Sequence, residues 1–406
     1  MTENASPAPN SAQPLADVRV LDIASFMAAP MAAMWLADFG ADVIKIEHPT
    51  GDMMRTWGSR KDDVPLFWKV VGRNKRAITL DLHHPRGQTL LKQMVAKADV
   101  LVENFRPGTM ARWGLAYEDL AAVNPRLVML SISAFGQTGP YSSRAGFGTL
   151  AEAMSGYAHV TGQPDGPPTL PSFGLADAIT GICGAYAVMV ALHERDAISG
   201  RGQSIDLGIY EPLLTALGHQ FIEYDQLGII AQRLGSRLPF ASPRNTFKTS
   251  DGSWVAMSCS AQSIFERACR AIGRADLIDD PRFLDNRART QHSQVLDDMF
   301  AEWIGQHPTD VVLATLNDAG AAVAPIYDVK GVFEDPHFQA RENMVTVADP
   351  DLGSLRMQGV VPKLSRTPGK VVHAGARLGE HNAEVYAEWA DLSTADLDDL
   401  RAQGVI

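Results

Sequence analysis

Residues 18–47 read VRVLDIASFMAAPMAAMWLADFGADVIKIE and decide the fold. Val18–Ala24 is a short apolar run, Met31–Phe39 consists of helix formers that end at Gly40, and Ala41–Glu47 is again strand-like. This order predicts a strand, a helix and a second strand within about thirty residues, which is a βαβ unit.

The same alternation continues along the chain. We expect further strands at 77–82, 99–103 and 126–133, and helices at 85–98 and 117–123. Alternating strands and helices favour an α/β fold with a parallel sheet that is covered on both faces.

The loops that follow these strands are where we expect a ligand. Ligands of parallel sheets bind beyond the carboxyl ends of the strands. The loops concerned are those after Ala24, Glu47, Glu103 and Ser133.

The middle of the chain changes character. An apolar helix is expected to end near Glu194, and residues 200–211 read as a turn, a strand and a helix start. Asp251-Gly252, between Phe247 and Trp254, is typical of a β-hairpin turn. The following region is mostly helical, with helices expected at 264–272, 293–304 and 311–317, and a last helix is expected from about residue 380. The middle region therefore predicts a separate, smaller domain.

Composition excludes several classes of protein. The 406 residues include 47 acidic and 36 basic side chains, which gives a formal net charge of −11. A nucleic-acid-binding protein is disfavoured, because phosphate contacts need clustered basic residues. The apolar stretch 178–192 is too short for a bilayer span, and the N-terminus lacks the pattern of a signal peptide, so we expect no membrane segment. Cys183, Cys259 and Cys269 form no disulfide or zinc pattern, which fits a cytoplasmic protein.

Common cofactor and catalytic motifs are missing from the sequence. The loop after the first strand has no GxGxxG, and the chain has no GxxxxGK[ST], HExxH or GxSxG motif. The eleven histidines are scattered. We therefore predict no metal site and no permanently bound cofactor.

Basic residues gather near the expected loops. Arg73, Lys75 and Arg76 precede one expected strand, Arg106 follows another, and Arg112 and Arg144 lie further on. Such side chains form charge-assisted hydrogen bonds to phosphate oxygens. Phe105 beside Asn104 could pack against and orient an adenine. A solvated surface with a Pro-Gly turn explains the same pattern.

Asp177 lies just ahead of the apolar helix, within PSFGLADAITGICGAYAVMVALHE. One interpretation is an N-cap of that helix. The other is a desolvated carboxylate nucleophile that forms a covalent acyl intermediate, with small residues at Ala178, Gly181 and Gly184 allowing close backbone approach. Residue type and position leave both open.

A series of collinear blocks carries a family resemblance. The blocks are VLDIASFMAAP, LADFGADVIKIEHPTGDMMR, NKRAITLDL, ADVLVENFRPG, SISAFGQTGPY, TGQPDGPP, GRGQSIDLGIYE and LGEHN. The chain resembles the class III coenzyme A transferases, which include formyl-CoA transferase, carnitine CoA-transferase and 2-methylacyl-CoA racemase, from about residue 17 to the C-terminus.

The resemblance implies a Rossmann-like large domain built from both ends of the chain and a smaller α+β domain between them, in an interlocked homodimer. The implied parts are a disordered tail at 1–16, the large domain at 17–220 and 329–406, and the small domain at 221–328. In this family a carboxylate takes the acyl group from a thioester, and an enzyme–CoA thioester then passes CoA to an incoming carboxylic acid. That carboxylate falls on Asp177. Coenzyme A and acyl-CoA are thereby substrates.

The family's CoA-contacting positions are also implied by the resemblance. They fall on Met27, His48, Arg73, Asn74, Lys75, Arg76, Asn104, Phe105, Arg106, Arg112 and Arg144. His48 departs from the family, where Arg is common.

Two departures bear on the reaction. Racemases carry a proton-transferring histidine where this chain has Phe147, and an acidic residue where it has Gln262, so racemisation is disfavoured. Oxalate-using transferases have a run of glycines where residues 258–262 read SCSAQ. Oxalate is therefore disfavoured as a substrate, and Ser258, Ser260 and Gln262 could instead hydrogen-bond the carboxylate of another acid. We predict Phe147 and Gln262 to be substrate-binding residues. The leading hypothesis is CoA transfer to a carboxylic acid, with a dicarboxylate as one option; the alternatives are a 2-methylacyl-CoA racemase and an inactive CoA-binding protein.

Overall fold

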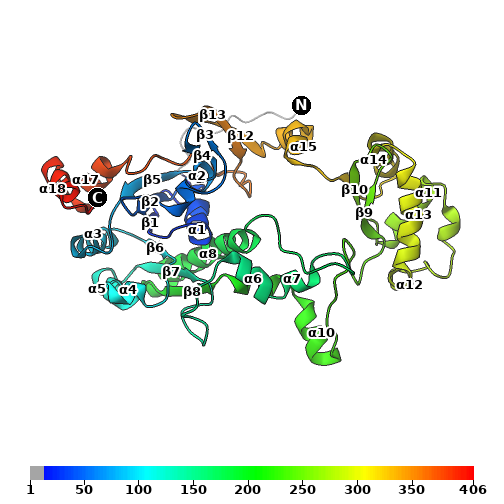
Figure 1. Cartoon of the computed structure of the whole chain (residues 1–406), viewed down its shortest axis with the longest axis horizontal. Coiled ribbons are helices and arrows are strands. Elements are labelled where there is room, and N and C mark those ends of the chain that lie inside the picture. The colour runs from blue at the N-terminus through cyan, green and yellow to red at the C-terminus, as the bar shows by residue number, and fades with distance from the viewer. Residues whose placement is uncertain (1–12) are drawn as a thin grey trace. The chain divides into compact units, whose positions relative to one another are not determined.

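A computed structural model describes residues 13–406. Its main feature is a six-stranded sheet, in which all neighbouring strands are parallel, with the order β5-β2-β1-β6-β7-β8 (Figure 1). Numbered along the sheet-forming strands alone, this is the 3-2-1-4-5-6 order of doubly wound folds. The strands are β1 Arg19–Asp22, β2 Asp42–Glu47, β5 Lys75–Thr79, β6 Val100–Glu103, β7 Val128–Ser133 and β8 Ser204–Gly208. The mixed α/β fold with a parallel sheet is confirmed.

Two apolar layers cover the sheet. On one face, Val20, Val102 and Leu130 pack with helices α1 (Ala28–Ala37) and α8 (Leu175–Glu194). The other face packs against α3 (Pro85–Val95), α5 (Tyr117–Val123), α17 (Asn382–Ala390) and α18 (Thr394–Ala402). The chain's C-terminal end thus returns to the sheet, as Figure 1 shows in red.

Shorter elements complete this part of the chain. The helices are α2 Leu66–Val71, α4 Thr109–Arg112, α6 Gly148–Met154, α9 Tyr210–Ala216 and α16 Pro336–Ala340, with a 3-10 turn at Met53–Arg55 and a π-helical turn at Arg195–Ser199. Helix α7 (Tyr157–Val160) begins a short segment that belongs to the second compact unit described next. Two small antiparallel pairs are β3 Arg60–Lys61 with β4 Val64–Pro65, and β12 Met344–Asp349 with β13 Gly353–Gln358.

The middle of the chain forms a second compact unit. Its antiparallel sheet has the order β11-β10-β9, and the pairing of β9 with β10 confirms the predicted hairpin. Its core contains Phe247, Val255, Phe265, Phe300 and Leu316. The elements are α10 His219–Leu227, β9 Arg244–Lys248, β10 Trp254–Ser258, α11 Gln262–Ala271, a 3-10 turn at Ala275–Leu277, α12 Asn286–Gln291, α13 Ser293–Gly305, α14 Thr309–Asp318, β11 Val323–Pro325 and α15 Val329–Glu334.

The two units divide the chain differently from the expected boundaries. The smaller unit comprises Ala158–Leu170 and Gln220–His337, and the larger unit holds the remaining three segments. The short segment joins the smaller unit through local bonds: the N–H of Gly235 donates to the carbonyl of Gly162, and Arg233 donates to the carbonyl of His159. These contacts could not be anticipated from composition.

The two ends of the chain differ in detail from expectation. The predicted disordered tail lies outside the described residues up to residue 12. Leu15 was also predicted to belong to this tail, but it packs against the core, and its N–H donates to the carbonyl of Phe39. At the other end, the predicted last helix is two helices, α17 and α18, because Asp391 adopts a left-handed conformation with φ of 56°.

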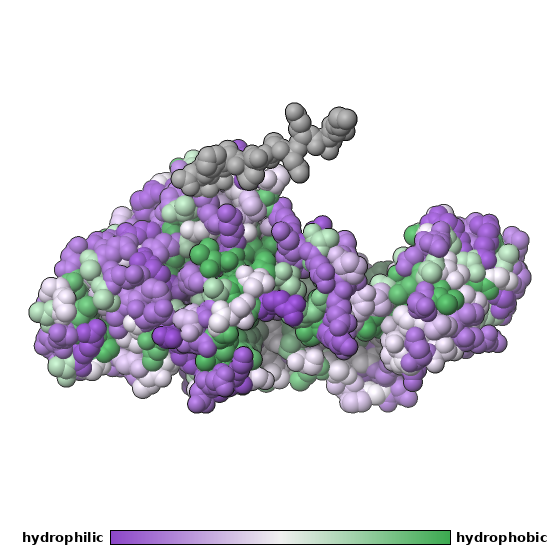
Figure 2. Space-filling model, turned by 90° about the horizontal axis from the view of Figure 1, so that it is seen from above, coloured by the Kyte–Doolittle hydropathy of each residue, from purple (hydrophilic) through white to green (hydrophobic). Residues whose placement is uncertain are grey.

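The apolar helix α8 ends at Glu194, as the sequence predicted. With the π-helical turn that follows, it spans the 25 residues Leu175–Ser199, and an 18-residue window in it has a mean hydropathy of 1.8. By length and composition alone it could therefore cross a membrane, which the stretch 178–192 did not indicate. Close packing explains the composition: α8 lies along α1, and a Cβ added at Gly181 would come within 2.8 Å of Met31 Cβ. The outer side of α8 exposes Ile182, Tyr186 and Val190. Figure 2 shows one face of the molecule, where hydrophobic residues gather in a patch on the larger unit.

Candidate functional site

The site lies at the carboxyl edge of the parallel sheet. The strand order reverses between β1 and β6, and ligands of such sheets bind in the crevice at that point. Here the Asn104 side chain joins the loop after β6 to the loop after β1. Its Oδ1 accepts from the N–H of Ser25 at 2.8 Å, and its Nδ2 donates to the carbonyl of Ser25 at 2.6 Å. Asn104 therefore holds together two of the loops at which the sequence predicted a ligand; this pair of hydrogen bonds is called the Asn104 clasp below.

A crevice of about 190 Å³ opens beside this clasp. Phe105, Trp113 and His83 form one wall, with ring centres 5.0 Å apart for each adjacent pair. His48 lies at the mouth, where its Nδ1 accepts from the N–H of Thr50 at 3.2 Å. Flat aromatic walls with polar groups at the mouth suit a planar, hydrogen-bonding ligand.

His48, Asp81 and His83 also gather closely. One ligand atom of each lies within 4.8 Å of the others, a spacing that could hold a metal ion. In the structure, His83 Nδ1 lies 3.0 Å from an Asp81 oxygen, and hydrogen bonds from His83 and the nearby imidazoles hold the pKa of Asp81 below its usual value despite some burial. The histidines thus have a local counter-charge.

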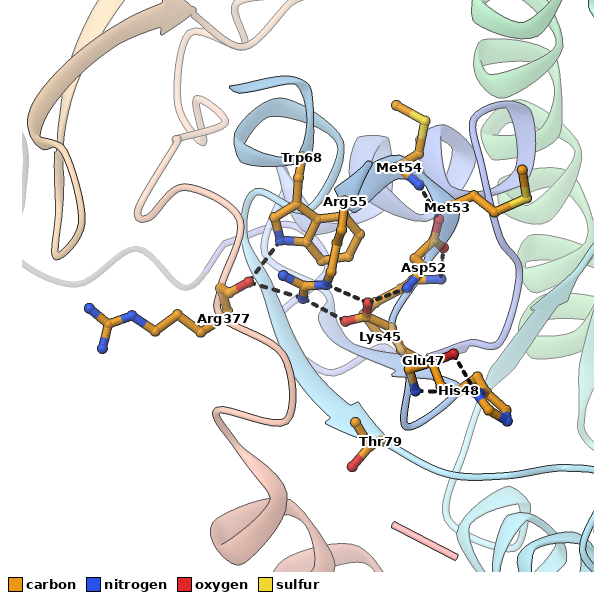
Figure 3. A network of polar contacts seen from close by, with 12 residues as sticks. Lys45, Glu47, His48, Asp52, Met53, Met54, Arg55, Trp68, Thr79 and Arg377 are labelled. Carbon is orange, nitrogen blue, oxygen red and sulfur yellow. Dashed lines mark hydrogen bonds and ion pairs between the residues drawn. The ribbon is translucent and has the colours of Figure 1, made fainter. Parts of the chain in front are cut away.

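A polar network anchors the loop that follows β2 (Figure 3). Arg55 donates to both carboxylate oxygens of Glu47, at 2.6 and 2.7 Å, and its guanidinium carbon lies 3.8 Å from the centre of the Trp68 ring. Both Arg55 and Trp68 also donate to the carbonyl of Ala376. The network ties the C-terminal segment to this wall of the crevice.

Asp52 extends the network to the loop after β1. Its Oδ1 accepts from the N–H groups of Phe26 at 3.2 Å and Met54 at 2.8 Å, and its Oδ2 lies 3.2 Å from Lys45 Nζ. Phe26 has a φ of 70°, which is unfavourable for a residue with a side chain. Asp52 therefore holds a strained turn in place.

That turn presents an aromatic group, defined here as Phe26, Trp57 and Phe147. The Phe26 ring centre lies 4.4 Å from that of Trp57 and 5.8 Å from that of Phe147. Trp57 and Phe147 are 50% and 61% exposed, so their rings are available to a ligand. Phe147 directly precedes Gly148, which touches Asp177.

Asp177 lies in the first turn of α8 but does not cap it. The N-cap residue is Gly174, so the N-cap interpretation of Asp177 was wrong. A Cβ added at Gly148 would come within 2.2 Å of Asp177 Oδ2, and one at Gly174 would meet both Met27 and Asp177. The two glycines thus leave the room that the carboxylate occupies, with Met27 beside it.

The electrostatics of Asp177 favour a reactive carboxylate. It is 8% exposed, and no basic side chain in the described residues forms an ion pair with it. Burial, followed by the nearby charge of Glu152, raises its pKa to about 6. Glu152 is itself buried and accepts from the N–H of Ala176 at 3.2 Å. A desolvated carboxylate without a counter-ion is a stronger nucleophile than a solvated one.

Three of the predicted basic residues are exposed in the segments after β6 and β7. Arg106 and Arg112 follow β6, and Arg144 follows β7 with its guanidinium carbon 3.6 Å from the centre of the Tyr141 ring. Arg112 donates to the Thr109 hydroxyl. None of the three forms an ion pair with a carboxylate in the described part of the chain. Their charges are therefore available to an anion.

The stretch Arg73–Arg76 lies elsewhere. Lys75 pairs with Val43 near the start of β2, so the stretch lies at the amino edge of the sheet, opposite the crevice. Arg73 donates to both oxygens of Asp38, and Lys75 Nζ lies 2.8 Å from Asp22.

The other two residues of the stretch are also engaged. Asn74 bonds to Asp38 and to the carbonyl of Lys370, and Arg76 pairs with Asp42. The polar groups of these four residues thus already have internal partners, and their contact with CoA stays a prediction.

Gln262 lies in the smaller unit, at the start of α11. Its Oε1 accepts from Arg289 at 2.7 Å and its Nε2 donates to Glu266 at 3.2 Å. Its amide is thus used within that unit, and its role as a substrate-binding residue stays a prediction.

Several site residues were missed from the sequence. Glu152 is a lone acid in a short apolar helix, and Trp57, His83 and Trp113 occur in unremarkable loops. Glu103, at the end of β6, accepts from the N–H of Phe105, and burial raises its pKa to about 7. The one available signal was position, because Glu103 and His83 lie at or just after the ends of strands of the parallel sheet.

A doubly wound sheet with a crevice at its switch point and an unpaired buried carboxylate defines an α/β enzyme. The sequence model of the protein family CoA-transferase family III matches residues 15–382 of this chain.

Individual relatives agree. A succinyl-CoA–D-citramalate CoA-transferase of Chloroflexus aurantiacus is 45% identical over 396 residues, covering 97% of this chain and 98% of that protein. A succinate–glutarate CoA-transferase of Agrobacterium fabrum is 36% identical, covering 94% and 96%. A CAIB/BAIF family protein from Brucella suis has a TM-score of 0.83 at 34% identity, covering 93% of this chain and all of that one. The chain belongs to CoA-transferase family III.

Proposed function

We propose that this enzyme transfers CoA from an acyl-CoA to a dicarboxylic acid, with Asp177 as the covalent nucleophile. The observation that carries the proposal is the buried, unpaired carboxylate of Asp177 between Gly148 and Gly174. The names of similar proteins support the acid class, because succinate, malate, citramalate, glutarate and oxalate are all dicarboxylic acids.

The proposed reaction needs no cofactor. The Asp177 carboxylate attacks the thioester carbonyl and releases CoA thiolate, which leaves a mixed anhydride. The thiolate attacks the aspartyl carbonyl of that anhydride, which releases the first acid and forms an aspartyl–CoA thioester. The acceptor carboxylate then attacks this thioester, and the released thiolate attacks the acceptor's acyl carbonyl, which frees Asp177 and the new acyl-CoA.

The geometry suits these steps. Burial excludes water, which would hydrolyse the anhydride. The positive end of the α8 dipole faces Asp177 and stabilises negative charge that develops there. Met27 packs beside the carboxylate and the aromatic group borders it, so apolar surface is available to the acyl chain.

For CoA itself we propose a position along the crevice. The adenine fits against Phe105 and Trp113, close to the Asn104 clasp. Arg106, Arg112 and Arg144 supply charge for the phosphates, and His48 is an additional contact at the mouth. This set replaces the larger one that the sequence suggested.

We also propose a homodimer in the cytoplasm, with interlocked subunits. Exposed large apolar side chains on α8 and a mostly apolar hollow of about 460 Å³ lined by Trp35, Tyr186 and Met189 support an interface. The three free cysteines support a reducing compartment.

The test compares the wild-type chain with Asp177→Asn, using succinyl-CoA as donor and malate or citramalate as acceptor. We expect transfer to fall at least about a thousandfold, because an amide cannot form the anhydride. Mass spectrometry of the peptide that carries the substitution controls for deamidation. Normal turnover by the intact Asp177→Asn variant would refute the nucleophile, and rapid α-deuterium exchange in heavy water without transfer would favour the racemase alternative.

A further inference from the structure

Two histidines and an aspartate that take no part in the proposed chemistry meet at the mouth of the crevice. One ligand atom each of His48, Asp81 and His83 lies within 4.8 Å of the others, and no second group of this kind is found in the described residues. The eleven histidines are scattered along the sequence, so no metal site was expected there. The fold is what brings His48 and His83 together.

The pairing of two neighbouring strands explains why these residues meet. Strands β2 and β5 are parallel neighbours, and the N–H of Leu80 donates to the carbonyl of Glu47 at 2.7 Å. His48 and Asp81 directly follow these two bonded residues, and Figure 3 shows His48 next to Glu47. The N–H of Asp81 also donates to the carbonyl of Val405 at 2.8 Å, which ties its segment to the C-terminal part of the chain. The backbone that carries the cluster is therefore held by hydrogen bonds.

The separations of the three side chains are close to those of a metal site. Asp81 Oδ1 lies 3.0 Å from His83 Nδ1 and 3.9 Å from His48 Nε2. Zn²⁺ binds imidazole nitrogens and carboxylate oxygens at about 2.0–2.2 Å in tetrahedral geometry, which places its ligand atoms about 3.3 Å apart. The His48 and His83 side chains are 46% and 72% exposed, so small rotations can bring both nitrogens to such distances and an ion can enter from solvent.

Each imidazole has a neighbour that can orient it. His48 Nδ1 lies 2.7 Å from the Thr50 hydroxyl oxygen. In the tautomer whose Nε2 is free to bind an ion, Nδ1–H can donate to that hydroxyl, and metal-ligating histidines commonly use their other ring nitrogen in this way. The His83 ring packs edge-on against Trp113, with the ring centres 5.0 Å apart.

The charges around the cluster favour a cation. In the described residues, the ion-pair partners of Asp81 are His48 and His83, and no lysine or arginine neutralises its carboxylate. Two imidazole nitrogens with one carboxylate oxygen suit Zn²⁺ and similar transition metals, whereas Mg²⁺ and Ca²⁺ prefer oxygen ligands alone. Three protein ligands also leave a fourth position for water.

We propose that His48, Asp81 and His83 form a binding site for one divalent transition-metal ion, with Zn²⁺ as the best-fitting ion. The ion joins the loop after β2 to the loop after β5 at the mouth of the crevice, because His48 and His83 both line that crevice. The site lies wholly within the larger unit. It does not depend on the proposed function, since no step of the transfer needs the ion.

The experiment uses the full-length chain without a histidine tag, treated with a chelator and then dialysed. Zn²⁺ binding is measured by isothermal titration calorimetry, and Co²⁺ is titrated separately because its visible spectrum reports on its ligands. The variants are His48→Gln, Asp81→Asn and His83→Gln, each of which removes one ligand. His193→Gln is the matched control, because His193 is an exposed histidine of the same unit that belongs to no such cluster.

We expect the wild type to bind one Zn²⁺ per chain and to melt at a higher temperature with the ion, because an ion that binds only the folded protein stabilises it. Each ligand variant should weaken Zn²⁺ binding by at least about 10- to 100-fold, a loss that even removal of a supporting partner of a ligand can cause. His193→Gln should bind Zn²⁺ as the wild type does. Mg²⁺ at the same concentration should not displace Zn²⁺.

Several results would overturn the metal site. One is a wild-type chain that binds no Zn²⁺, and another is a set of folded ligand variants that bind it as the wild type does. Loss of binding in Asp81→Asn alone, or equal competition by Mg²⁺, would show non-specific attraction to acidic groups and overturn the site as well. If one variant fails to fold, the other two decide the question. None of these measurements uses CoA transfer, so failure of the proposed function and failure of the metal site are seen separately.

Discussion

The two edges of the parallel sheet use similar charged residues for opposite purposes. At the amino edge, Arg73 is buried and bound to Asp38. At the carboxyl edge, arginines of the loops lie exposed without carboxylate partners in the described part of the chain, and Asp177 is buried without a cation. The difference teaches that a charged residue is available for binding or chemistry where its charge has not been neutralised by the fold.

The largest effect on folding should come from the amino edge. Arg73→Met leaves Asp38 buried without its main partner, which costs about 3–5 kcal/mol of unfolding free energy. Urea denaturation should show this loss. The double variant Arg73→Met with Asp38→Leu should recover much of it, because no buried charge is then left unpaired. If the folded Arg73→Met variant had a tenfold higher KM for acyl-CoA, Arg73 would serve binding as well as folding, which would contradict the difference between the two edges.

A smaller effect, on binding alone, is expected at the carboxyl edge. Replacing Arg106, Arg112 or Arg144 singly by Met should raise the KM for acyl-CoA about tenfold, through loss of a phosphate contact. Unfolding free energies should stay within about 0.5 kcal/mol of the wild type, since these side chains are exposed. A lower unfolding free energy with an unchanged KM for acyl-CoA would show that these arginines stabilise the fold and do not bind acyl-CoA. The two edges of the sheet would then not differ.

The smallest of these effects should be a shift in the pH dependence of kcat/KM. Asp177 must be ionised to attack, and its pKa is about 6, so kcat/KM should fall as the pH drops below about 6. Glu152→Gln keeps an oxygen that can accept from the N–H of Ala176 but removes the charge that raises this pKa. The acidic limb of the profile should move to lower pH in that variant.

The same pKa has a consequence for stability that can be checked separately. The value in the folded protein lies above the ordinary 3.8, so the charged form of Asp177 destabilises the fold at neutral pH. This penalty should shrink as the pH falls through about 6 and be absent below 3.8. Asp177→Asn should therefore be as stable as the wild type or more stable at pH 7, while its transfer activity is lost.

The sequence predicted the sheet well, because hydrophobic periodicity depends on neighbouring residues. The strand expected at 41–47 is β2 at Asp42–Glu47, and the helix expected at 117–123 is α5 with those bounds. Phe105 lines the crevice and Asn104 joins the loops beside it, which their position directly after a strand could suggest. Their contact with CoA stays a prediction.

The parts that failed depend on contacts between distant segments. Nothing in the order NKRAITLDL indicates that Asp38 and Asp22 reach its basic residues, so Arg73 and Lys75 read as free charges. Glu152 was missed because its effect on Asp177 arises only when two separate helices meet. Family resemblance located Asp177, whereas its lack of a counter-ion emerged from the structure.

The most direct test of the account is to trap the covalent intermediate. The wild-type enzyme is mixed with succinyl-CoA without acceptor, quenched in acid, digested and analysed by mass spectrometry. We predict a CoA thioester on the peptide that contains Asp177, and its conversion to a hydroxamate by hydroxylamine. An adduct on any other residue, or efficient transfer with no adduct at Asp177, would contradict it.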